Sequence, residues 1–403
     1  MNIWIFNHHA LTPDMSGGTR HYDFAKELVL RGHNVTIIAS SFHYSAYKEM
    51  KEYGDRDYLQ ETVDGIKFIW FKTPPYFGNG ISRVKNMLSY TLKVLTIIPK
   101  LNLKKPDIII GSSVHLFAVF ASYKLSKKYN VPFIMEVRDL WPQTLIDMGI
   151  SKWHPFILLL GWLEKYLYKK ANKIITNLPY AYQYIERFVT RDKIIWISNG
   201  VDLCSIDYVN KKKSEKFIIS YTGAIGAANN LALLIETADK LKNEPNIFFR
   251  IVGDGAEKEH LKNIIHSKNL TNITIESPVP KNQVSEILAS SDILYFNLKN
   301  SPVFNYGISS NKLFDYMAAG RVIIFSTKAK NNPIQDANAG YSIEPDDIEQ
   351  LVRTILEIYT LSQEERNEIG RKIRKYAEEN YSIQILTNKL EEILENERGK
   401  HDD

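Results

Sequence analysis

The chain has 403 residues, of which 44% are hydrophobic and 24% charged, with a formal net charge of +5. This length predicts about two or three domains, and this composition is typical of a soluble globular protein. The single Cys204 excludes an intrachain disulfide framework and indicates a reducing compartment. Met1–Thr12 lacks the pattern of a signal peptide, and the longest apolar run, Phe156–Leu163, is too short to span a bilayer.

The two halves of the chain differ in charge. Residues 1–200 carry 26 Lys and Arg against 16 Asp and Glu, a balance of +10, whereas residues 201–403 carry 25 against 30, a balance of −5. Between Asp64 and Asp107 the sequence has no acidic residue and eight basic ones: Lys67, Lys72, Arg83, Lys85, Lys93, Lys100, Lys104 and Lys105. We therefore expect the first half to meet an anionic surface or a polyanion.

The chain begins with the pattern of a βαβ unit. Asn2–Phe6 is an apolar strand, Gly17–Arg20 is a glycine turn that opens a helix, and Val35–Ala39 is a second strand. This order is typical of a doubly wound sheet. The turn lacks the full dinucleotide fingerprint, so it indicates either an anion-binding turn or simply a tight turn that needs glycine.

A basic helix follows the strand Gly65–Phe71. In Val84–Leu103 the apolar residues recur with a helical period among lysines, and no acidic residue interrupts them. Such a helix is suited to an anionic membrane, and we predict contact with an anionic membrane surface through residues 82–105. The alternative is a core helix with one solvated face.

Four more strands alternate with helices in the first half: Asp107–Gly111, Val131–Val137, Lys173–Thr176 and Ile194–Ile197, with helices over Leu116–Lys127 and Trp153–Leu167. Arg138 and Asp139 directly follow a strand, at the sheet edge where open α/β sheets bind ligands. The aromatic residues of the second helix, Trp153 and Trp162 among them, are suited to a lipid interface, although core packing is the commoner use.

A second α/β series follows a polar, lysine-rich segment, Leu203–Lys216, which we interpret as a linker. Its predicted strands are Phe217–Tyr221, Phe248–Val252, Ile273–Glu276, Ile293–Phe296, Val322–Phe325 and Gly340–Ile343. Glycine turns follow the first two of these strands, and they let backbone N–H groups approach an anion closely. The chain closes with a charged helix over Glu364–Asn396 that is interrupted at Tyr381.

The stretch Gly307–Ile324 predicts a polar loop, a helix, a glycine stop at Gly320 and a buried strand. Lys312 falls in the first turn of that helix. A helix N-terminus beside a lysine is a physical anion site, well suited to a phosphate. An ordinary capped helix that binds nothing is the alternative.

Other chemistries have little support in the sequence. The turn Gly223–Ala228 lacks the spacing of a dinucleotide fingerprint. Asp55–Asp57 has the spacing of a metal-binding DxD but lies in a charged early loop, and the ten histidines show no metal-ligand spacing. No serine lies in a nucleophile elbow, and one cysteine offers no thiol dyad. We therefore predict no metal site and no hydrolase.

Six segments occur in order along nearly the whole chain: GGTRHYDFAKELVLRGHNVTII, VRDLWPQT, ISNGVD, YTGAIG, IVGDGAEKEHL and SSNKLFDYMAAG. Together they resemble retaining glycosyltransferases of family 4, which have the GT-B fold. The forms RDLWP and NKLFDYMAAG resemble a bacterial subgroup that builds O-antigen, capsule or colanic-acid-type polysaccharides and includes fucosamine transferases.

The resemblance implies an α/β architecture of two doubly wound, Rossmann-like domains facing across a cleft, with a C-terminal helix returning to the first. We expect an acceptor-binding domain over residues 1–200, a nucleotide-sugar-binding domain over 201–375, and a helix over 376–403 that packs back on the N-terminal domain. The nucleotide-sugar acts as co-substrate, and we expect no further cofactor.

The resemblance also implies roles for particular residues. Lys312 would neutralise the donor diphosphate, and Asp315 stands where the family's second motif glutamate binds the donor ribose. Gly307 replaces the first motif glutamate, and the family's Arg and Lys phosphate clamp is missing, with Ala224 and Asn229 or Asn230 in its place. Lys312 would therefore carry more of the phosphate charge than is usual in the family.

Retention in this fold needs no protein nucleophile, because the departing phosphate can take the acceptor proton. The predicted catalytic residues are Lys312, Arg138 and Asp139, the last two replacing a frequent His-Asp pair. His115 is a weaker candidate, for which a structural role is the main expectation. The predicted donor-binding residues are Gly18, Arg20, Thr222, Gly223, Gly253, Val279, Ser309, Ser310, Asn311 and Asp315.

These implications predict a glycosyltransferase at the cytoplasmic face of the plasma membrane. It would move a sugar, expected to be an N-acetylated or deoxy aminosugar on UDP, to a polyprenyl-diphosphate-linked saccharide, with no role for nucleic acid. A nucleotide-sugar 2-epimerase of the same fold is one alternative. A non-catalytic nucleotide-sugar-binding partner in a polysaccharide assembly complex is the other.

Overall fold

The computed structural model describes residues 1–78, 80–206 and 215–402, so residues 207–214 of the predicted linker lie outside the described residues. The chain forms two compact units. Unit 1 comprises 1–12, 19–198 and 383–403, and unit 2 comprises 13–18 and 199–382. The chain thus leaves unit 1 after Ser198 and returns to it at Ile383, rather than at the expected positions 200 and 376.

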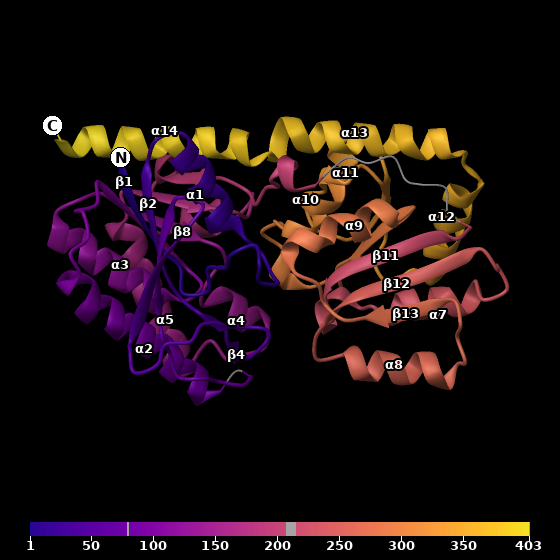
Figure 1. The fold of residues 1–403 in the computed structure, drawn as a ribbon, viewed down its shortest axis with the longest axis horizontal. Coiled ribbons are helices and arrows are strands. Elements are labelled where there is room, and N and C mark those ends of the chain that lie inside the picture. Colours follow the sequence, from indigo (N-terminus) through magenta and orange to yellow (C-terminus); the bar gives the residue numbers. More distant parts are fainter. Residues whose placement is uncertain (79, 207–214, 403) are drawn as a thin grey trace. The chain divides into compact units, whose positions relative to one another are not determined.

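Unit 1 is built on an eight-stranded sheet (Figure 1). Its strands, in spatial order, are β10 (Ile194–Trp196), β9 (Lys173–Thr176), β8 (Phe133–Val137), β7 (Ile108–Ser112), β1 (Asn2–Phe6), β2 (Asn34–Ser40), β6 (Ile66–Phe71) and β5 (Tyr58–Val63). All neighbours pair in parallel except β5, which is antiparallel to β6. The central strands are buried on both faces, which is why their sequences are continuous apolar runs.

Helices cover both faces of this sheet. On one face α1 (Arg20–Leu30) packs on β2 and β6, and α14 (Ile383–Asp402) packs on α1. On the other, α3 (Leu116–Tyr129) packs on β7 and β8 and lies between α2 (Ile81–Ile97) and α5 (Pro155–Lys170). Short elements complete the unit: β3 (Phe42–His43), β4 (Lys48–Glu49), α4 (Gln143–Asp147) and α6 (Tyr182–Ile185).

Unit 2 has a six-stranded, fully parallel sheet. Its spatial order is β13 (Ile273–Glu276), β12 (Ile247–Asp254), β11 (Phe217–Ala224), β14 (Ile293–Asn297), β15 (Val322–Ser326) and β16 (Tyr341–Ile343). The helices are α7 (Ala232–Lys240), α8 (Lys258–Ser267), α9 (Val284–Ser290), α10 (Asn311–Ala318), α11 (Pro333–Asp336), α12 (Ile348–Thr360) and α13 (Gln363–Tyr381).

The predicted C-terminal helix is in fact two helices that belong to different units. α13 packs on α10 and β15 in unit 2, and only α14 packs in unit 1. The helical packing on the N-terminal domain therefore begins at Ile383 and not at residue 376. The predicted interruption lies at the right place, because α13 ends at Tyr381.

Each sheet has one point where the strand order reverses. In unit 1 it lies between β1 and β7, and in unit 2 it lies between β11 and β14. Ligands of open α/β sheets bind outside the carboxyl ends of the strands at such a switch point. The predicted doubly wound α/β architecture is confirmed for both units. None of the helices in the described part of the chain is long and apolar enough to cross a membrane.

Candidate functional site

The helix that carries Lys312 begins and ends as predicted. Asn311 is its first residue, and Ala319, just before Gly320, caps its end. Ser310 at the N-cap has an extended backbone, and its side chain makes no capping hydrogen bond. The partial positive charge of the first turn is therefore left for an anion.

Lys312 lies over the switch point of unit 2. Its ammonium is 4.0 Å from the ring centre of Tyr221, in β11, and 4.8 Å from that of Phe296, in β14. It donates to the Tyr221 hydroxyl, and Asn229 Oδ1 lies 3.4 Å away. The two rings thus come from the two strands between which the strand order reverses.

These surroundings lower the proton affinity of Lys312. Burial reduces the pKa of its ammonium from 10.5 to about 7. Its hydrogen-bond partners in the described part of the chain are the Tyr221 hydroxyl and the Asn229 amide oxygen, both neutral. A diphosphate beside this group would supply the missing negative charge and favour the protonated form.

Two glycines leave room beside the ammonium. Gly223 has φ +133°, and a Cβ there would lie 2.9 Å from Lys312 Nζ. Gly253 pairs with Gly223 across β11 and β12, and a Cβ on Gly253 would overlap the Gly223 carbonyl oxygen. Both predicted donor-binding glycines therefore lie at the carboxyl edge of the sheet, where any side chain would displace Lys312 or a strand.

Asp315 follows Lys312 by one helical turn and forms an ion pair with Lys281. The side chains of Asp315 and Lys281 are 10% and 19% exposed, so this pair is largely withdrawn from solvent. Lys281 lies after β13, in the segment that also holds Val279. Lys281 was not among the predicted site residues. Its only signal in the sequence is a lysine beyond a strand end, and such lysines are common.

The loop before α10 is held from two directions. The Ser309 hydroxyl accepts the backbone N–H of Asn199 at 2.7 Å, and the Asn199 amide donates to the Ser309 carbonyl. Gly18 lies directly against the Asn311 side chain, where a Cβ would overlap the Asn311 amide nitrogen. Gly18, Ser309, Ser310 and Asn311 are thus brought together around the start of α10.

Gly307 is required by its backbone conformation. Its φ is +91°, a value that side chains rarely adopt, so a glutamate at this position would be strained. A glycine therefore fits the path of the loop at this position, where the resemblance predicts the family's first motif glutamate. Thr222, another predicted donor-binding residue, is buried, and its backbone N–H already donates to the Tyr316 hydroxyl at 2.7 Å.

Arg20 does not fit its predicted donor-binding role. The residue is 3% exposed, and its guanidinium bonds Glu136 at 2.8 Å and the carbonyls of Ile197 and Ser198. These bonds satisfy the charge inside unit 1, so Arg20 joins α1 to the ends of β8 and β10. No pattern in the sequence indicates this contact, because Glu136 lies 116 residues away.

Arg138 and Asp139 lie at the carboxyl edge of unit 1, directly after β8, as predicted. The backbone N–H of Arg138 donates to the Ser113 hydroxyl at 3.1 Å, which ties this edge to the end of β7. Arg138 is half-buried, and Asp139 is exposed. Asp57 of the early DxD pairs instead with Lys93 at 2.5 Å.

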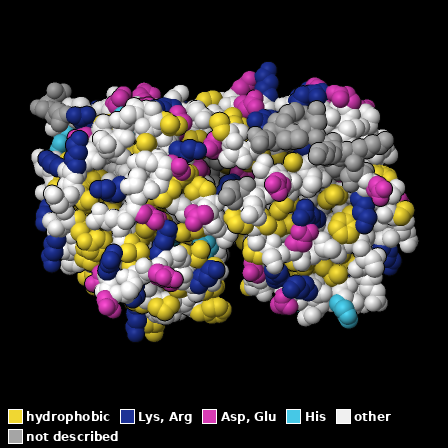
Figure 2. Space-filling model, in the orientation of Figure 1, with side chains coloured by type: hydrophobic (Ala, Val, Ile, Leu, Met, Phe, Trp, Pro, Cys, Tyr) yellow, Lys and Arg dark blue, Asp and Glu magenta, His cyan; other side chains and the backbone are white. Residues whose placement is uncertain are grey.

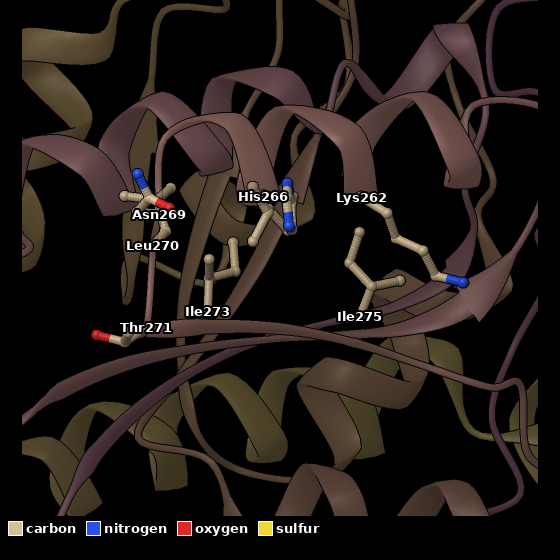
Figure 3. A pocket seen from close by; sticks show the side chains of 8 residues that line it. Lys262, His266, Asn269, Leu270, Thr271, Ile273 and Ile275 are labelled. Atoms are coloured by element: carbon tan, nitrogen blue, oxygen red, sulfur yellow. The ribbon is translucent and has the colours of Figure 1, made fainter.

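A separate recess of about 370 Å³ lies between α8 and β13 (Figure 3). Lys262 and His266 point into it from the helix, opposite Ile273 and Ile275 of the strand. It contains none of the predicted site residues. Among the described residues, no group of three or more His, Cys, Asp or Glu is placed to hold a metal ion.

Two family models match the chain in succession. Residues 16–204 match Glycosyltransferase Family 4, and residues 206–376 match Glycosyl transferases group 1. Between them they leave out only 1–15, 205 and 377–403. The chain belongs to glycosyltransferase family 4. It is therefore a glycosyltransferase, and the predicted family and enzyme class are confirmed.

Relatives of this family 4 member share its length. WcaI of Escherichia coli (strain K12), named for glycosyl transfer in colanic acid biosynthesis, is 23% identical over 390 residues, which cover 91% of this chain and 93% of WcaI. Sucrose-phosphate synthase from Thermosynechococcus elongatus has a TM-score of 0.75 at 15% identity, with 98% of each chain covered. Anabaena Alr3699/HepE, solved with UDP and glucose, has a TM-score of 0.69 at 14% identity, with 98% and 100% covered. The expected GT-B fold is thereby confirmed.

Proposed function

We propose that this glycosyltransferase moves a sugar, with retention, from a UDP-linked donor to a polyprenyl-diphosphate-linked saccharide in bacterial surface polysaccharide biosynthesis. The observation that carries the proposal is the Lys312 ammonium, held over the switch point of unit 2 by neutral partners. The name of WcaI supports a polysaccharide product, and the UDP bound to Alr3699/HepE supports the nucleotide.

In the proposed mechanism Lys312 receives the donor diphosphate, whose negative charge grows as the bond to the sugar breaks. A positioned cation stabilises that developing charge, and the N-terminus of α10 adds backbone N–H groups. The departing phosphate takes the acceptor proton on the same face of the sugar. Asp139 is proposed to orient the acceptor or the sugar, and Arg138 is proposed to be a charge partner for a phosphate.

We further propose that unit 1 docks on the cytoplasmic face of an anionic membrane. α2 buries Tyr90 and Val94 and exposes Ile81, Leu88 and Leu92. The helix thus has one face packed in the core, and its exposed apolar residues support the proposed membrane contact. The exposed lysines of this stretch are Lys85, Lys100, Lys104 and Lys105. Lys93 does not belong with them, because it pairs with Asp57.

The same side of unit 1 carries more apolar surface than the basic helix alone. α5 and the segment before it expose Met148, Trp153, Leu158, Leu159 and Trp162, of which Trp153 is 73% exposed. Both α2 and α5 pack on α3. In Figure 2 hydrophobic side chains gather among lysines and arginines over this part of unit 1. Exposed apolar side chains among lysines suit an anionic lipid surface.

The transferred sugar is proposed to be an N-acetylated or deoxy aminosugar, and the product an O-antigen- or capsule-type polysaccharide. The test is an assay of purified protein with UDP-, GDP- and dTDP-sugars and a prenyl-diphosphate-linked acceptor. Sugar transfer with retained anomeric configuration supports the proposal. Conversion of the donor without acceptor identifies a 2-epimerase, and donor binding without turnover identifies a non-catalytic partner.

A further inference from the structure

The switch point of unit 1 is bridged by two histidines. His8 follows β1, and His115 follows β7 and is the N-cap of α3, where its Nδ1 accepts the Ala118 N–H at 3.1 Å. His8 Nδ1 and His115 Nε2 are joined by a hydrogen bond of 2.8 Å. The bond therefore links the two strands outside which an open α/β sheet binds its ligand.

Two rings stack on His8, and two imidazole nitrogens of this group have no hydrogen-bond partner among the described residues. His8 lies between His9, with ring centres 4.4 Å apart, and Tyr90, at 4.3 Å. His8 is fully buried, yet among the described residues its Nε2 has no hydrogen-bond partner, and neither has His9 Nδ1. Buried polar atoms are almost always bonded, so such atoms at a switch point indicate a site for a polar ligand.

Two arginines place positive charge beside these rings. Burial, and then the charges of Arg83 and Arg138, reduce the pKa of His9 to about 3. Burial likewise holds the pKa of His8 and of His115 well below the usual value. The three imidazoles are therefore neutral, and the potential around them favours an anion. The carboxylate of Asp139 next to Arg138 offsets part of that charge.

Aromatic side chains lead from these charges to solvent. Arg83 lies 5.9 Å from the ring centre of Tyr76, and Tyr76 and Phe77 both contact Tyr47, with ring centres 6.0 and 4.7 Å apart. Phe77 is 80% exposed, and Ile81 at the start of α2 is 77% exposed. An anion bound at the arginines would thus have an apolar strip beside it.

We infer that the cluster of His8, His9, Arg83, His115 and Arg138 binds the diphosphate of the acceptor, and that the isoprenoid chain lies along Tyr47 and Phe77. Guanidinium groups bond phosphoryl oxygens in pairs, and a neutral imidazole donates one N–H. This inference rests on the proposed function, because it takes the lipid-linked acceptor as the substrate. A free diphosphate shares the same chemistry, so the test must separate the two sources.

The test measures the binding of three probes to the full chain by calorimetry: farnesyl diphosphate, inorganic pyrophosphate and UDP. We expect Arg83→Gln to lower the affinity for farnesyl diphosphate at least tenfold and to change the affinity for UDP by less than twofold. Arg83→Lys should recover part of the loss, and Phe77→Ser should weaken farnesyl diphosphate but not pyrophosphate. Arg191→Gln is the matched control, because Arg191 also lies over a tyrosine of unit 1, 4.4 Å from the Tyr182 ring.

The inference is overturned if Arg83→Gln binds farnesyl diphosphate as Arg191→Gln does, or if UDP displaces farnesyl diphosphate competitively. If Phe77→Ser weakens the binding of farnesyl diphosphate and of pyrophosphate equally, the isoprenoid chain does not lie along Tyr47 and Phe77. A second readout does not depend on stability: binding should raise the pKa of His9, measured from its imidazole resonances. The proposed function fails separately, if the protein binds and turns over no nucleotide-sugar.

Discussion

The ammonium of Lys312 and the ring of Tyr221 lie 4.0 Å apart, so that a side chain of α10 meets the strand β11 at the reversal of strand order. A cation in this position is attracted to the ring and has lost part of its hydration. It gains far more from a bound diphosphate than an exposed lysine would, since an exposed lysine keeps its water.

Replacing Lys312 tests this relationship directly. We expect Lys312→Met to lower kcat/KM for transfer at least 100-fold, about 2.7 kcal/mol, because the leaving diphosphate loses its cation. The fold should persist, since methionine fills similar space without a buried charge. Steady-state kinetics measure the loss and circular dichroism the fold. Lys242→Met, on a lysine 56% exposed, is the control, and equal activity in both variants would contradict the role.

Donor binding should take up a proton above neutral pH. The free protein holds Lys312 at a pKa of about 7, so at pH 8 the amine is mostly neutral, whereas the diphosphate complex favours the charged form. We expect uptake of about one proton per donor at pH 8 and donor affinity that falls as the pH rises above 7. Calorimetry in buffers of different ionisation enthalpy gives the proton count. A count near zero, or one that Lys312→Met leaves unchanged, would contradict this.

The ion pair of Lys281 with Asp315 should position the donor. Lys281→Met leaves a largely buried carboxylate without its cation, and we expect the KM for the donor to rise about tenfold, with a smaller change in kcat. Lys281→Arg should retain most of the affinity. Arg250→Met breaks the ion pair of Arg250 with Glu276, on the neighbouring strands β12 and β13, and serves as control. If the control raises KM as much, Lys281 acts only through the fold.

Glu164 should make the stability of unit 1 depend on pH. The carboxyl is 1% exposed and accepts the hydroxyls of Tyr168 and Tyr184, and burial raises its pKa from 4.5 to about 8. Folding therefore favours its protonated form, and its contribution to stability is complete below pH 4.5 and is lost as the pH rises towards 8.

We expect Glu164→Gln to remove this decline, which amounts to at most about 1.4 kcal/mol per pH unit. Thermal unfolding from pH 5 to pH 9 is the measurement. The exposed Glu186→Gln should follow the wild type across this range. A parallel decline in Glu164→Gln would show that another group is responsible.

Membrane binding by unit 1 should depend on Trp153 and Trp162. Trp153→Ser with Trp162→Ser should weaken binding to phosphatidylglycerol vesicles at least tenfold, because each indole buries a large apolar surface at the lipid interface. Vesicle sedimentation measures binding. Leu30→Ser is the matched control, since Leu30 is equally exposed, at 73%, but lies on α1 at the opposite face of the sheet. If the tryptophan variant and Leu30→Ser bind the vesicles equally well, this face of unit 1 is not the membrane-binding face.

The strands could be predicted because they are buried on both sides. Asn2–Phe6 and Val322–Phe325 are continuous apolar runs with glycine or polar punctuation, and the structure places both within one residue of the prediction. The edge strand Tyr58–Val63 was missed, because one of its faces is solvated and its sequence is polar. The sequence predicted one helix over Glu364–Asn396, whereas the structure divides this range between α13 of unit 2 and α14 of unit 1. The chain passes from unit 2 to unit 1 between Ser382 and Ile383.

The site could be predicted only where one local pattern contains it. Lys312, Ser310 and Asp315 share a helix, so their grouping follows from its period. The partner of Asp315 lies 34 residues away, and no pattern joins the two. The misjudged Arg20 shows the same limit. An arginine at the start of a helix suggests an anion, but its anion is Glu136 of the same unit, which only the folded sheet brings near.

The division of the chain into units has a consequence for the order of folding. Unit 2 comprises 199–382 with the short segment 13–18, whereas α14 of unit 1 is synthesised after all of these residues. Arg31, which caps the end of α1, bonds Glu391 on α14 at 2.7 Å, so an early helix of unit 1 packs against one that is synthesised much later. On the ribosome unit 2 can close around its own core while unit 1 still lacks one layer. A stall before residue 383 would therefore leave the apolar side of α1 uncovered, within reach of chaperones.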